Sequence, residues 1–355
     1  MLIVRLIVIF LLMLALSACQ SVSGTTPQTA PPQKAPAKAA DAHKLIILIH
    51  GGAGSARPGG YPEEDEAAYR AALAHALDTG YAVLASGGAA IDAVQAAIVT
   101  LEDNPLFNAG KGAVFTAAGH NEMDSSIMDG RDRNAGAVAG VSIVKNPILA
   151  ARAVMDKSPH VMLAYKGADA FAKEQGLEIV PPSYFYTKKR WEQLQRALAA
   201  AKAHAAMPAT SHFGTVGAVA LDSHGHLAAG TSTGGMTMKR FGRIGDSPII
   251  GAGTYASDLS CAVSATGWGE FFIRATAARD ICARVQFTGA SIQDAADTVI
   301  ADIKKMGGTG GVLALTPDGD YAFSFSTQMM FRGVKTAAGK DVHIFAHEDQ
   351  PGKDE

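Results

Sequence analysis

Two apolar runs on either side of a short polar turn constrain the fold more than any other stretch. The runs are 216–221 and 226–232, and the turn between them, 222–225, ends in glycine. Strand-forming runs about a short glycine-containing turn are typical of a β-hairpin. The middle of this chain is therefore predicted to be a pair of antiparallel strands.

The predicted hairpin brings two threonines together. A turn centred near His224 places Thr215 opposite Thr233. Directly opposed residues of an antiparallel pair have Cβ atoms roughly 4.5–5.5 Å apart. The sequence thus predicts two neighbouring hydroxyl groups, one of them directly after a glycine, Gly214.

That arrangement suggests a nucleophile at Thr215. A threonine hydroxyl attacks well only when a base removes its proton, and the residue's own α-amine is one such base. The amine exists only if the chain is cut before the threonine. Gly214 fits such a cut, because a residue without Cβ tolerates a strained backbone. The alternative is an ordinary hairpin threonine with good β-propensity.

Residues 1–19 are predicted to be a targeting segment. One charge, Arg5, precedes an apolar run over 6–16, which is shorter than the roughly 20 apolar residues of a membrane span. The ending Leu-Ser-Ala-Cys at Cys19 resembles a bacterial lipobox, in which the cysteine is lipidated and becomes the mature N-terminus. Gln20 resembles the outer-membrane sorting pattern. We therefore expect a periplasmic protein, lipid-anchored to the outer membrane.

The rest of the chain divides into a tether and one large domain. Residues 20–43 are rich in Ser, Thr, Pro, Ala, Gln and Lys, so they are predicted to be a flexible tether. Residues 44–355 are enough for a single large core. Net charge is −2 without a basic tract, which argues against nucleic-acid binding. Cys261 and Cys282 are compatible both with a disulfide in an oxidising compartment and with two buried thiols.

Strands and helices are expected in blocks, with hairpins instead of strict β-α-β crossovers. This order favours stacked antiparallel sheets covered by helices, an α+β fold. The predicted strands outside the central hairpin are 45–49, 137–144, 249–256, 262–265, 312–315 and 321–326, and the predicted helices are 63–76, 89–101, 148–155, 188–206, 270–286 and 291–305.

Two polar constellations follow the hairpin. Arg243 and Asp246 share a loop, where a guanidinium beside a carboxylate would hold the α-carboxylate and α-ammonium of an amino acid; a surface ion pair is the alternative. The stretch 266–270 joins a strand to a helix. Backbone N–H groups at such a junction suit an oxyanion hole, and an ordinary glycine-rich turn is the alternative.

Three other motifs lack the pattern that their chemistry needs. The run 108–112 does not have the spacing of a phosphate-binding loop and does not follow a strand. His224 and His226 have no further metal-ligand pattern around them, so a polar turn is the better interpretation. The run 329–331 is interpreted as packing.

The accumulated stretches resemble a known family. HGGAG, LEDNPLFNAGKGAVF, GTVGAVALD, TSTGGM, GRIGDSPIIGAGTYA and ATGWGEFFIRA, in this order from about Lys44 to Gly333, are similar to plant-type L-asparaginases, also called isoaspartyl peptidases. The resemblance implies an N-terminal-nucleophile hydrolase with four αββα layers. It also implies self-cleavage after Gly214 into an α chain and a β chain, 215–355, and hydrolysis of β-aspartyl dipeptides and L-asparagine.

The resemblance also implies roles for individual residues. The expected catalytic group contains the nucleophile, its partner threonine and an oxyanion-stabilising threonine. The substrate-binding group contains the pair Arg243 and Asp246, called the clamp below, together with two glycines and an asparagine. These are Thr215, Thr233 and Thr266 for catalysis, and Arg243, Asp246, Gly267, Gly269 and Asn108 for substrate binding.

The resemblance also implies which cofactor, bound ion and partners to expect. No cofactor is expected for catalysis. A structural sodium ion is expected in the loop over 101–112, held mostly by backbone carbonyls. The residues expected at this ion are Leu101, Glu102, Phe107 and Ala109. The partners are a small-molecule substrate, the membrane through the lipid anchor alone, and a second copy in a homodimer of αβ units.

Two other functions compete with this one. A glycosylasparaginase would share fold and nucleophile, but its nucleophile segment usually reads His-Asp-Thr-Ile-Gly, whereas residues 212–217 read His-Phe-Gly-Thr-Val-Gly. A non-catalytic lipoprotein that binds amino acids or cell-wall peptides belongs to a different class. The intact Thr215, Thr233, Arg243 and Asp246 argue against it.

Overall fold

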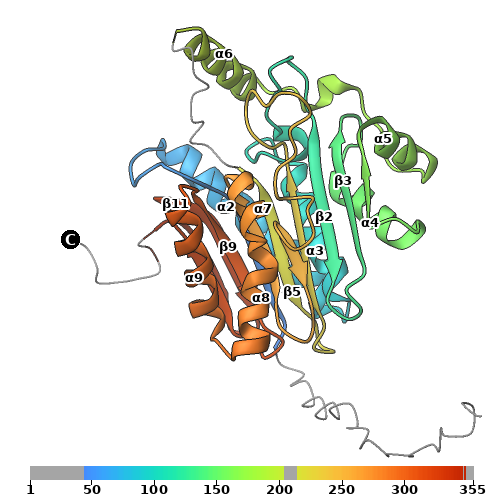
Figure 1. Ribbon diagram of the computed structural model, residues 1–355, viewed down its shortest axis with the longest axis vertical. Coiled ribbons are helices and arrows are strands. Elements are labelled where there is room, and N and C mark those ends of the chain that lie inside the picture. The colour runs from blue at the N-terminus through green and yellow to red at the C-terminus, as the bar shows by residue number, and fades with distance from the viewer. Residues whose placement is uncertain (1–43, 204–213, 347, 349–355) are drawn as a thin grey trace, which may run out of the picture. The chain divides into compact units, whose positions relative to one another are not determined.

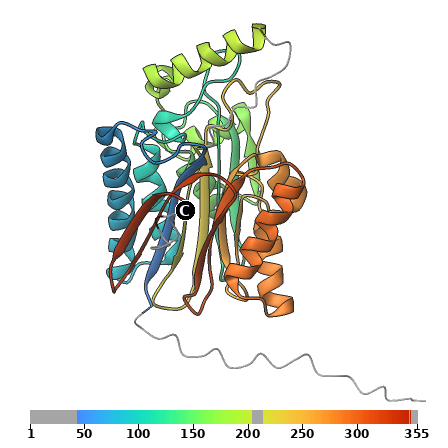
Figure 2. The ribbon, with the colours of Figure 1, turned by 90° about the vertical axis from the view of Figure 1, so that its left-hand side faces the viewer.

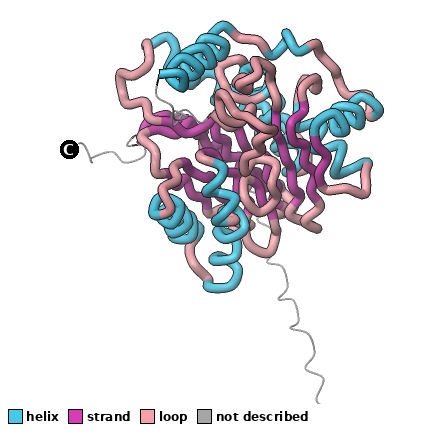
Figure 3. Tube along the Cα trace, turned by 45° about the horizontal axis from the view of Figure 1, so that its top comes forward, coloured by secondary structure: helices cyan, strands magenta, loops and turns pink. Residues whose placement is uncertain are grey.

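Two β-sheets lie face to face in the middle of the fold, and helices cover the outer face of each sheet (Figures 1 and 2). The computed structural model describes residues 44–203, 214–346 and 348. Figure 3 shows the strands inside and the helices outside. The predicted α+β fold with four αββα layers is confirmed.

The larger sheet has eight strands and contains the central hairpin. Its neighbouring strands are antiparallel except for the last pair, β3 and β4. In spatial order the strands are β12 (Lys340–Phe345), β11 (Met329–Thr336), β1 (Ile46–Gly54), β5 (Val216–Leu221), β6 (Leu227–Thr233), β2 (Met123–Asp129), β3 (Ala135–Val141) and β4 (Met162–Ala164).

The smaller sheet has four strands, and all of its pairs are antiparallel. Its strand β8 (Ala262–Gly267) leads directly into the 266–270 junction of the candidate site. In spatial order the strands are β10 (Tyr321–Phe325), β9 (Gly310–Leu315), β8 (Ala262–Gly267) and β7 (Thr254–Ala256).

Strand β1 shows how one sheet serves two cores. Ile47 and Ile49 belong to the core beneath the helices of the larger sheet, whereas Ile46 and Leu48 belong to the core between the sheets. Successive side chains of a strand point to opposite faces, so an all-apolar strand is buried on both sides. This position explains the unbroken apolar run before His50.

Helices form the two outer layers and one separate projection. α2 to α5 pack on the larger sheet, and α8 and α9 pack on the smaller one. α6 lies beyond one end of the strands, where it packs on Phe115 and Met238 (Figure 1). The helices are α2 (Glu63–Ala85), α3 (Ala90–Glu102), α4 (Pro147–Lys157), α5 (Tyr165–Glu174), α6 (Lys188–Ala203), α7 (Gly269–Ala275), α8 (Ala277–Thr288) and α9 (Ile292–Lys305), with short 3₁₀ turns at Gly110–Gly112 and Pro182–Phe185.

Two predicted elements were wrong for the same reason. The helix predicted over 270–286 is broken at Thr276, which has φ +46°, and the strand predicted over 249–256 begins only at Thr254. Residues 249–253 form a turn, whose carbonyls accept hydrogen bonds from the first N–H groups of α8. These tertiary bonds replace the local helical and ladder bonds that the sequence pattern favoured.

Other elements were absent from the prediction. β2 was not predicted, because its sequence MDSSIMD lacks the composition typical of a strand. β4 and α5 were not predicted either. β11 and β12 form the edge of the larger sheet beyond β1, although the run 329–331 had been interpreted only as packing.

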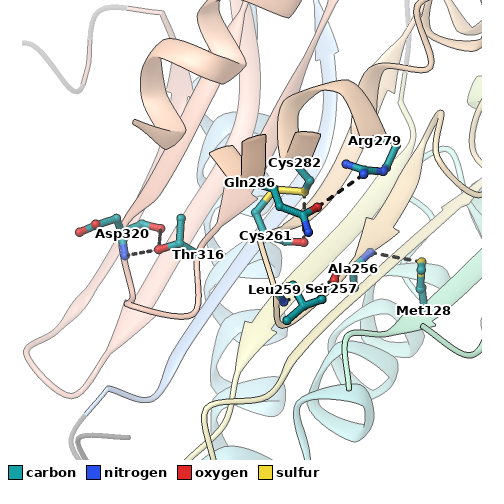
Figure 4. The surroundings of a disulfide bond; sticks show 10 residues. All are labelled: Met128, Ala256, Ser257, Leu259, Cys261, Arg279, Cys282, Gln286, Thr316 and Asp320. Atoms are coloured by element: carbon teal, nitrogen blue, oxygen red, sulfur yellow. Dashed lines mark hydrogen bonds between the residues drawn. A yellow bond between two sulfur atoms is a disulfide. The ribbon is translucent and has the colours of Figure 1, made fainter. Parts of the chain in front are cut away.

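A disulfide joins Cys261, just before β8, to Cys282 in α8 (Figure 4). Their Cα atoms are 5.2 Å apart, and both residues are buried. Of the two states that the sequence left open, the structure contains the disulfide. In the part of the chain that the structure describes, no helix is long and apolar enough to cross a membrane. The predicted lipidated cysteine, Cys19, and the tether lie outside the described residues.

Candidate active site

Thr215 and Thr233 lie side by side, as the hairpin predicted. Val216 at the start of β5 faces Ser232 of β6, so the next pair along the ladder is Thr215 and Thr233. Their hydroxyl oxygens are 3.0 Å apart, and both residues are buried. The Thr215 hydroxyl donates to Thr233 Oγ1, which also accepts the N–H of Gly235 at 2.9 Å. This pair of bonds fixes where the Thr215 hydroxyl points.

Asn108 holds the carbonyl on the other side of the Gly214–Thr215 bond. Its backbone N–H donates to Gly214 O at 3.1 Å. The Asn108 side chain is fixed in turn, since Oδ1 accepts from Val114 N and Nδ2 donates to Gly235 O. A Cβ on Gly214 would lie 2.6 Å from that of Asn108, so only glycine fits here. The donor that polarises this carbonyl is therefore already in place.

His50, at the end of the apolar part of β1, contacts the backbone of the predicted nucleophile. Its Nδ1 lies 2.9 Å from the carbonyl oxygen of Thr215, and its Nε2 lies 2.9 Å from Ser264 Oγ. The ring is fully buried, and burial lowers its pKa to about 3. The imidazole is therefore neutral and acts through hydrogen bonding.

A chain of buried hydroxyls continues from His50 between the two sheets. Ser264 Oγ lies 2.7 Å from Thr231 Oγ1, which accepts from Thr254 Oγ1 at 2.6 Å. Ser126 Oγ completes the chain, with Thr254 Oγ1 at 2.8 Å and Ser247 O at 2.6 Å. The residues come from both sheets, so the chain connects the layers at the level of the site.

The predicted clamp has a third member. Arg243 makes a two-pronged ion pair with Glu270, with bonds of 2.9 and 2.8 Å. The charge of this carboxylate raises the pKa of Arg243 against the opposing effect of burial. Glu270 is the first-turn carboxylate of α7. A planar guanidinium held on one side by a carboxylate keeps a fixed direction for its remaining donors.

Asp246 lies beside Arg243 without a full set of partners. Its Oδ2 is buried and accepts no hydrogen bond from the described residues. Burial raises the pKa of Asp246 to about 7, although the charge of Arg243 opposes this shift. A Cβ on Gly269 would lie 2.7 Å from Asp246 Oδ1 and 2.9 Å from Arg243 Nη2. The absent side chain of Gly269 therefore lets the clamp residues approach α7.

A small pocket connects the clamp to the threonine pair. Thr215, Thr233, Arg243, Asp246 and Gly267 all line it. Thr266, the preceding residue of β8, has a buried hydroxyl without a hydrogen-bond partner among the described residues. An unpaired buried hydroxyl beside a nucleophile suits a negatively charged oxygen that develops there during reaction.

The loop predicted to hold sodium folds back on its own carbonyls. A Cβ on Gly110 would lie 2.3 Å from Glu102 O, and one on Gly112 would lie 2.0 Å from Phe107 O. Because both glycines lack a side chain, the carbonyl oxygens of Glu102 and Phe107 can lie close to them inside the loop. Backbone oxygens of this kind are suitable ligands for a hard cation. Of the other two predicted ligands, Ala109 belongs to this loop, whereas Leu101 lies in the last turn of α3. The ion itself stays a prediction.

The structure thus brings Thr215, Thr233, Arg243, Asp246 and Gly267 around one pocket. Gly269 and Asn108 adjoin it through the contacts above, and Thr266 directly precedes the pocket residue Gly267 in β8. Sequence reasoning missed His50 and Glu270 as members of the site. Both stand in stretches that carried the family resemblance, HGGAG and ATGWGEFFIRA, but no local pattern gave either of them a role.

Comparisons with known proteins find a matching family and several relatives. A family model described as asparaginase matches residues 43–344. The chain is 47% identical to an isoaspartyl peptidase of Salmonella typhimurium, over 82% of this chain and 95% of the relative. It is 48% identical to an isoaspartyl peptidase of Escherichia coli, over 81% and 92%. It is 40% identical to an isoaspartyl peptidase/L-asparaginase of Homo sapiens, over 82% and 93%.

Proposed function

Because the chain belongs to the asparaginase family, we propose that it hydrolyses β-aspartyl dipeptides and L-asparagine with Thr215 as nucleophile. The observation that carries this proposal is the single pocket shared by the Thr215–Thr233 pair and the Arg243–Asp246 clamp. One end of that pocket suits a reacting carbonyl, and the other end suits the free α-groups of an amino acid.

Maturation comes first in the proposed mechanism. Thr215 Oγ attacks the carbonyl carbon of Gly214, whose oxygen accepts the Asn108 N–H. The C–N bond of the peptide breaks as the ester forms, and the nitrogen of Thr215 takes up the hydroxyl proton and is released as an amine. Water then hydrolyses the ester, which leaves a carboxylate on Gly214 and a free N-terminus on Thr215. The α-amine is now the base for the hydroxyl beside it.

Substrate turnover takes place in the pocket that Thr215 shares with the clamp. The α-amine takes the hydroxyl proton as Oγ attacks the β-carbonyl of the aspartyl unit. The oxygen of that carbonyl becomes negative and is stabilised by the Thr266 hydroxyl and Gly267. The leaving amine takes the proton and departs, and a water molecule then hydrolyses the β-aspartyl ester on Thr215. Thr233 Oγ1 keeps the nucleophile aligned throughout.

The clamp explains why the aspartyl unit must be β-linked. Arg243 binds the free α-carboxylate, and Asp246 accepts the α-ammonium through its unpaired Oδ2. An α-linked aspartyl peptide has no free α-carboxylate, so it would bury the guanidinium against a neutral amide. That mismatch costs on the order of 2–5 kcal/mol.

A substrate panel tests the proposal. Purified enzyme is incubated with a β-aspartyl dipeptide, its α-linked isomer, L-asparagine and N-glycosylated asparagine, and released aspartate is measured. We expect hydrolysis of the β-linked dipeptide and asparagine only, and none by Thr215→Ala. Preferential turnover of the glycosylated compound would instead identify a glycosylasparaginase. Binding without turnover of any compound would identify a binding protein.

The proposal extends to location. A lipid on Cys19 would hold the protein at the periplasmic side of the outer membrane, and the targeting pattern of residues 1–19 supports this. The Cys261–Cys282 disulfide gives independent support, because disulfides persist in oxidising compartments such as the periplasm. Cys19→Ser should move the protein from the membrane to the soluble fraction. An unchanged mass and fractionation would contradict the anchor.

Assembly into a homodimer of αβ units is also part of the proposal. Edge strand β4 supports it, because its first residue, Met162, and the preceding residue, Val161, expose 37% and 54% of their surface. An exposed apolar sheet edge is suited to pairing with another chain. Light scattering should give twice the mass of one αβ unit, and a mass of one unit at micromolar concentration would contradict the dimer.

A further inference from the structure

A second pocket lies on the other side of the Gly214–Thr215 bond, and the mechanism above does not use it. It has a volume of about 420 Å³ and is lined by Gly214 and Asn108 together with residues of α2, α6 and β11. Gly214 lines this pocket, and its neighbour Thr215 lines the clamp pocket. The two pockets therefore meet at the predicted nucleophile.

The second pocket is positively charged. Lys189, Arg190 and Arg196 of α6 line it, and none of its described lining residues is an aspartate or a glutamate. Cations gathered in a concave site without carboxylates attract an anion. The composition of this pocket therefore points to a negatively charged ligand.

No acidic side chain among the described residues forms a hydrogen bond with the guanidinium of Arg190, so its positive charge is not neutralised in this way. Its side chain is buried, and burial lowers its pKa. Its hydrogen bonds to described residues all go to neutral acceptors, namely Gly112 O, Gln193 Oε1 and Leu106 O. A buried charge is costly without an opposite charge nearby. An anion in the pocket would reduce that cost.

The other two cations have donors that a ligand can reach. Lys189 Nζ donates to the hydroxyl of Tyr69, which leaves two of its three protons. The Arg196 side chain is 70% exposed, and its ion pair with Glu192 is as long as 4.0 Å. Both side chains are free to turn towards a carboxylate at the pocket mouth.

We propose that this second pocket binds the α-carboxylate of the departing residue when the substrate is a β-aspartyl dipeptide. The inference rests on the proposed function. With the aspartyl α-groups in the clamp pocket and the β-carbonyl at Thr215, the departing residue extends away from the clamp, towards Gly214. Its α-carboxylate is the anion that the lining of this pocket lacks, whereas L-asparagine releases ammonia and has no group for this pocket.

The walls also indicate which departing side chains fit best. Tyr61, Met329 and Phe331 are among the lining residues, as are Ala197 and Ala200 of α6. These surfaces are apolar or aromatic, so burial of an apolar side chain against them is favourable. The preferred substrates are therefore β-aspartyl dipeptides with an apolar second residue and a free C-terminus.

The test compares three substrates and two charge variants. The substrates are β-aspartyl-leucine, its C-terminal amide and L-asparagine. The test variant carries Lys189→Gln and Arg196→Gln, which remove two charges and leave neutral, polar side chains. The matched control is Lys188→Gln in the same helix. The Lys188 side chain is 87% exposed and does not line the pocket.

With wild-type enzyme we expect kcat/KM for the free acid to exceed that for the amide by roughly tenfold or more, because charge-assisted hydrogen bonds are lost with the amide. The double variant keeps Arg190, so it should lose most of that factor on the free acid and nothing on the amide or asparagine. Lys188→Gln should behave like wild type.

Equal rates on acid and amide, or an equal loss on all three substrates, would overturn the pocket assignment. Failure of the wild-type enzyme on asparagine and both dipeptides would instead contradict the proposed function, so the two failures are distinguishable.

Discussion

Nδ1 of the buried His50 lies 2.9 Å from the carbonyl oxygen of Thr215. A carbonyl only accepts, so Nδ1 carries the proton and Nε2 accepts the hydroxyl hydrogen of Ser264. After cleavage, Thr215 is the first residue of its fragment, so the hydrogen bonds to its carbonyl and from its hydroxyl hold it in place. His50 fixes the orientation of that carbonyl, so it is a positioning residue for Thr215, which carries both the nucleophile and the proposed base.

Replacing His50 should therefore reduce the chemical step. His50→Leu is expected to lower kcat by roughly ten- to a hundredfold with little change in KM, because the clamp is untouched. His50→Asn keeps an N–H donor near the Nδ1 position and should recover part of that loss. Steady-state kinetics on fully cleaved enzyme gives the answer. Equal kcat values for the two variants would contradict a positioning role.

Glu270 should act mainly on substrate affinity. Glu270→Gln weakens the two-pronged pair that orients Arg243, so KM for asparagine should rise by roughly tenfold, with self-cleavage unchanged. Glu192→Gln, which removes a carboxylate from longer ion pairs on α6, is the matched control. Slower self-cleavage in Glu270→Gln would show that the residue supports the fold at Thr215 as well.

The raised pKa of Asp246 predicts how affinity depends on pH. With a pKa of about 7, this carboxyl is protonated below pH 7 and ionised above it. Only the ionised form attracts the substrate ammonium, so KM should rise as the pH falls from 8 to 6. Asp246→Asn should give a high KM without that slope. A KM that stays constant from pH 6 to 8 in the unmodified enzyme would contradict this assignment.

Glu102 predicts a pH dependence of stability. Burial raises the pKa of this carboxyl to about 8 in the folded chain, and its Oε2 has no partner among the described residues. The folded state therefore holds the proton more tightly than the unfolded state. The resulting stabilisation is complete below the ordinary glutamate pKa and is lost as the pH rises through 8.

The corresponding variant is Glu102→Gln. Its melting temperature should change less between pH 5 and 8.5 than that of the unmodified protein, measured in a sodium-free buffer. The same melting curves in sodium test the predicted ion, which would raise the melting temperature of both proteins at high pH. Identical pH slopes for the two proteins would contradict a protonated Glu102.

The sequence predicted local relationships well. The Thr215–Thr233 pair follows from the length of one turn, because register in a hairpin is set by the residues between its strands. The loop of Arg243 and Asp246 and the junction after β8 were also located from their residues, and the roles given to them stay predictions. In each case the partners lie within one or two adjacent elements.

Relationships across the fold were not predictable in this way. His50 meets Thr215 because β1 pairs with β5, which stands far along the chain. The buried serines of β2 satisfy their hydroxyls in tertiary hydrogen bonds, so no apolar alternation marks the strand. The break at Thr276 depends on carbonyls of the 249–253 turn. Such features are decided by packing partners that a local pattern does not contain.

The most direct test of the account is the mass of the enzyme after rapid acid quenching during turnover of a β-aspartyl dipeptide. The account predicts two fragments under denaturing conditions, the smaller beginning at Thr215 and carrying one β-aspartyl ester in a fraction of the molecules. Thr215→Ala should give one uncut, inactive chain. Full activity in a sample that remains a single chain, or an ester on the larger fragment, would contradict Thr215 as the nucleophile.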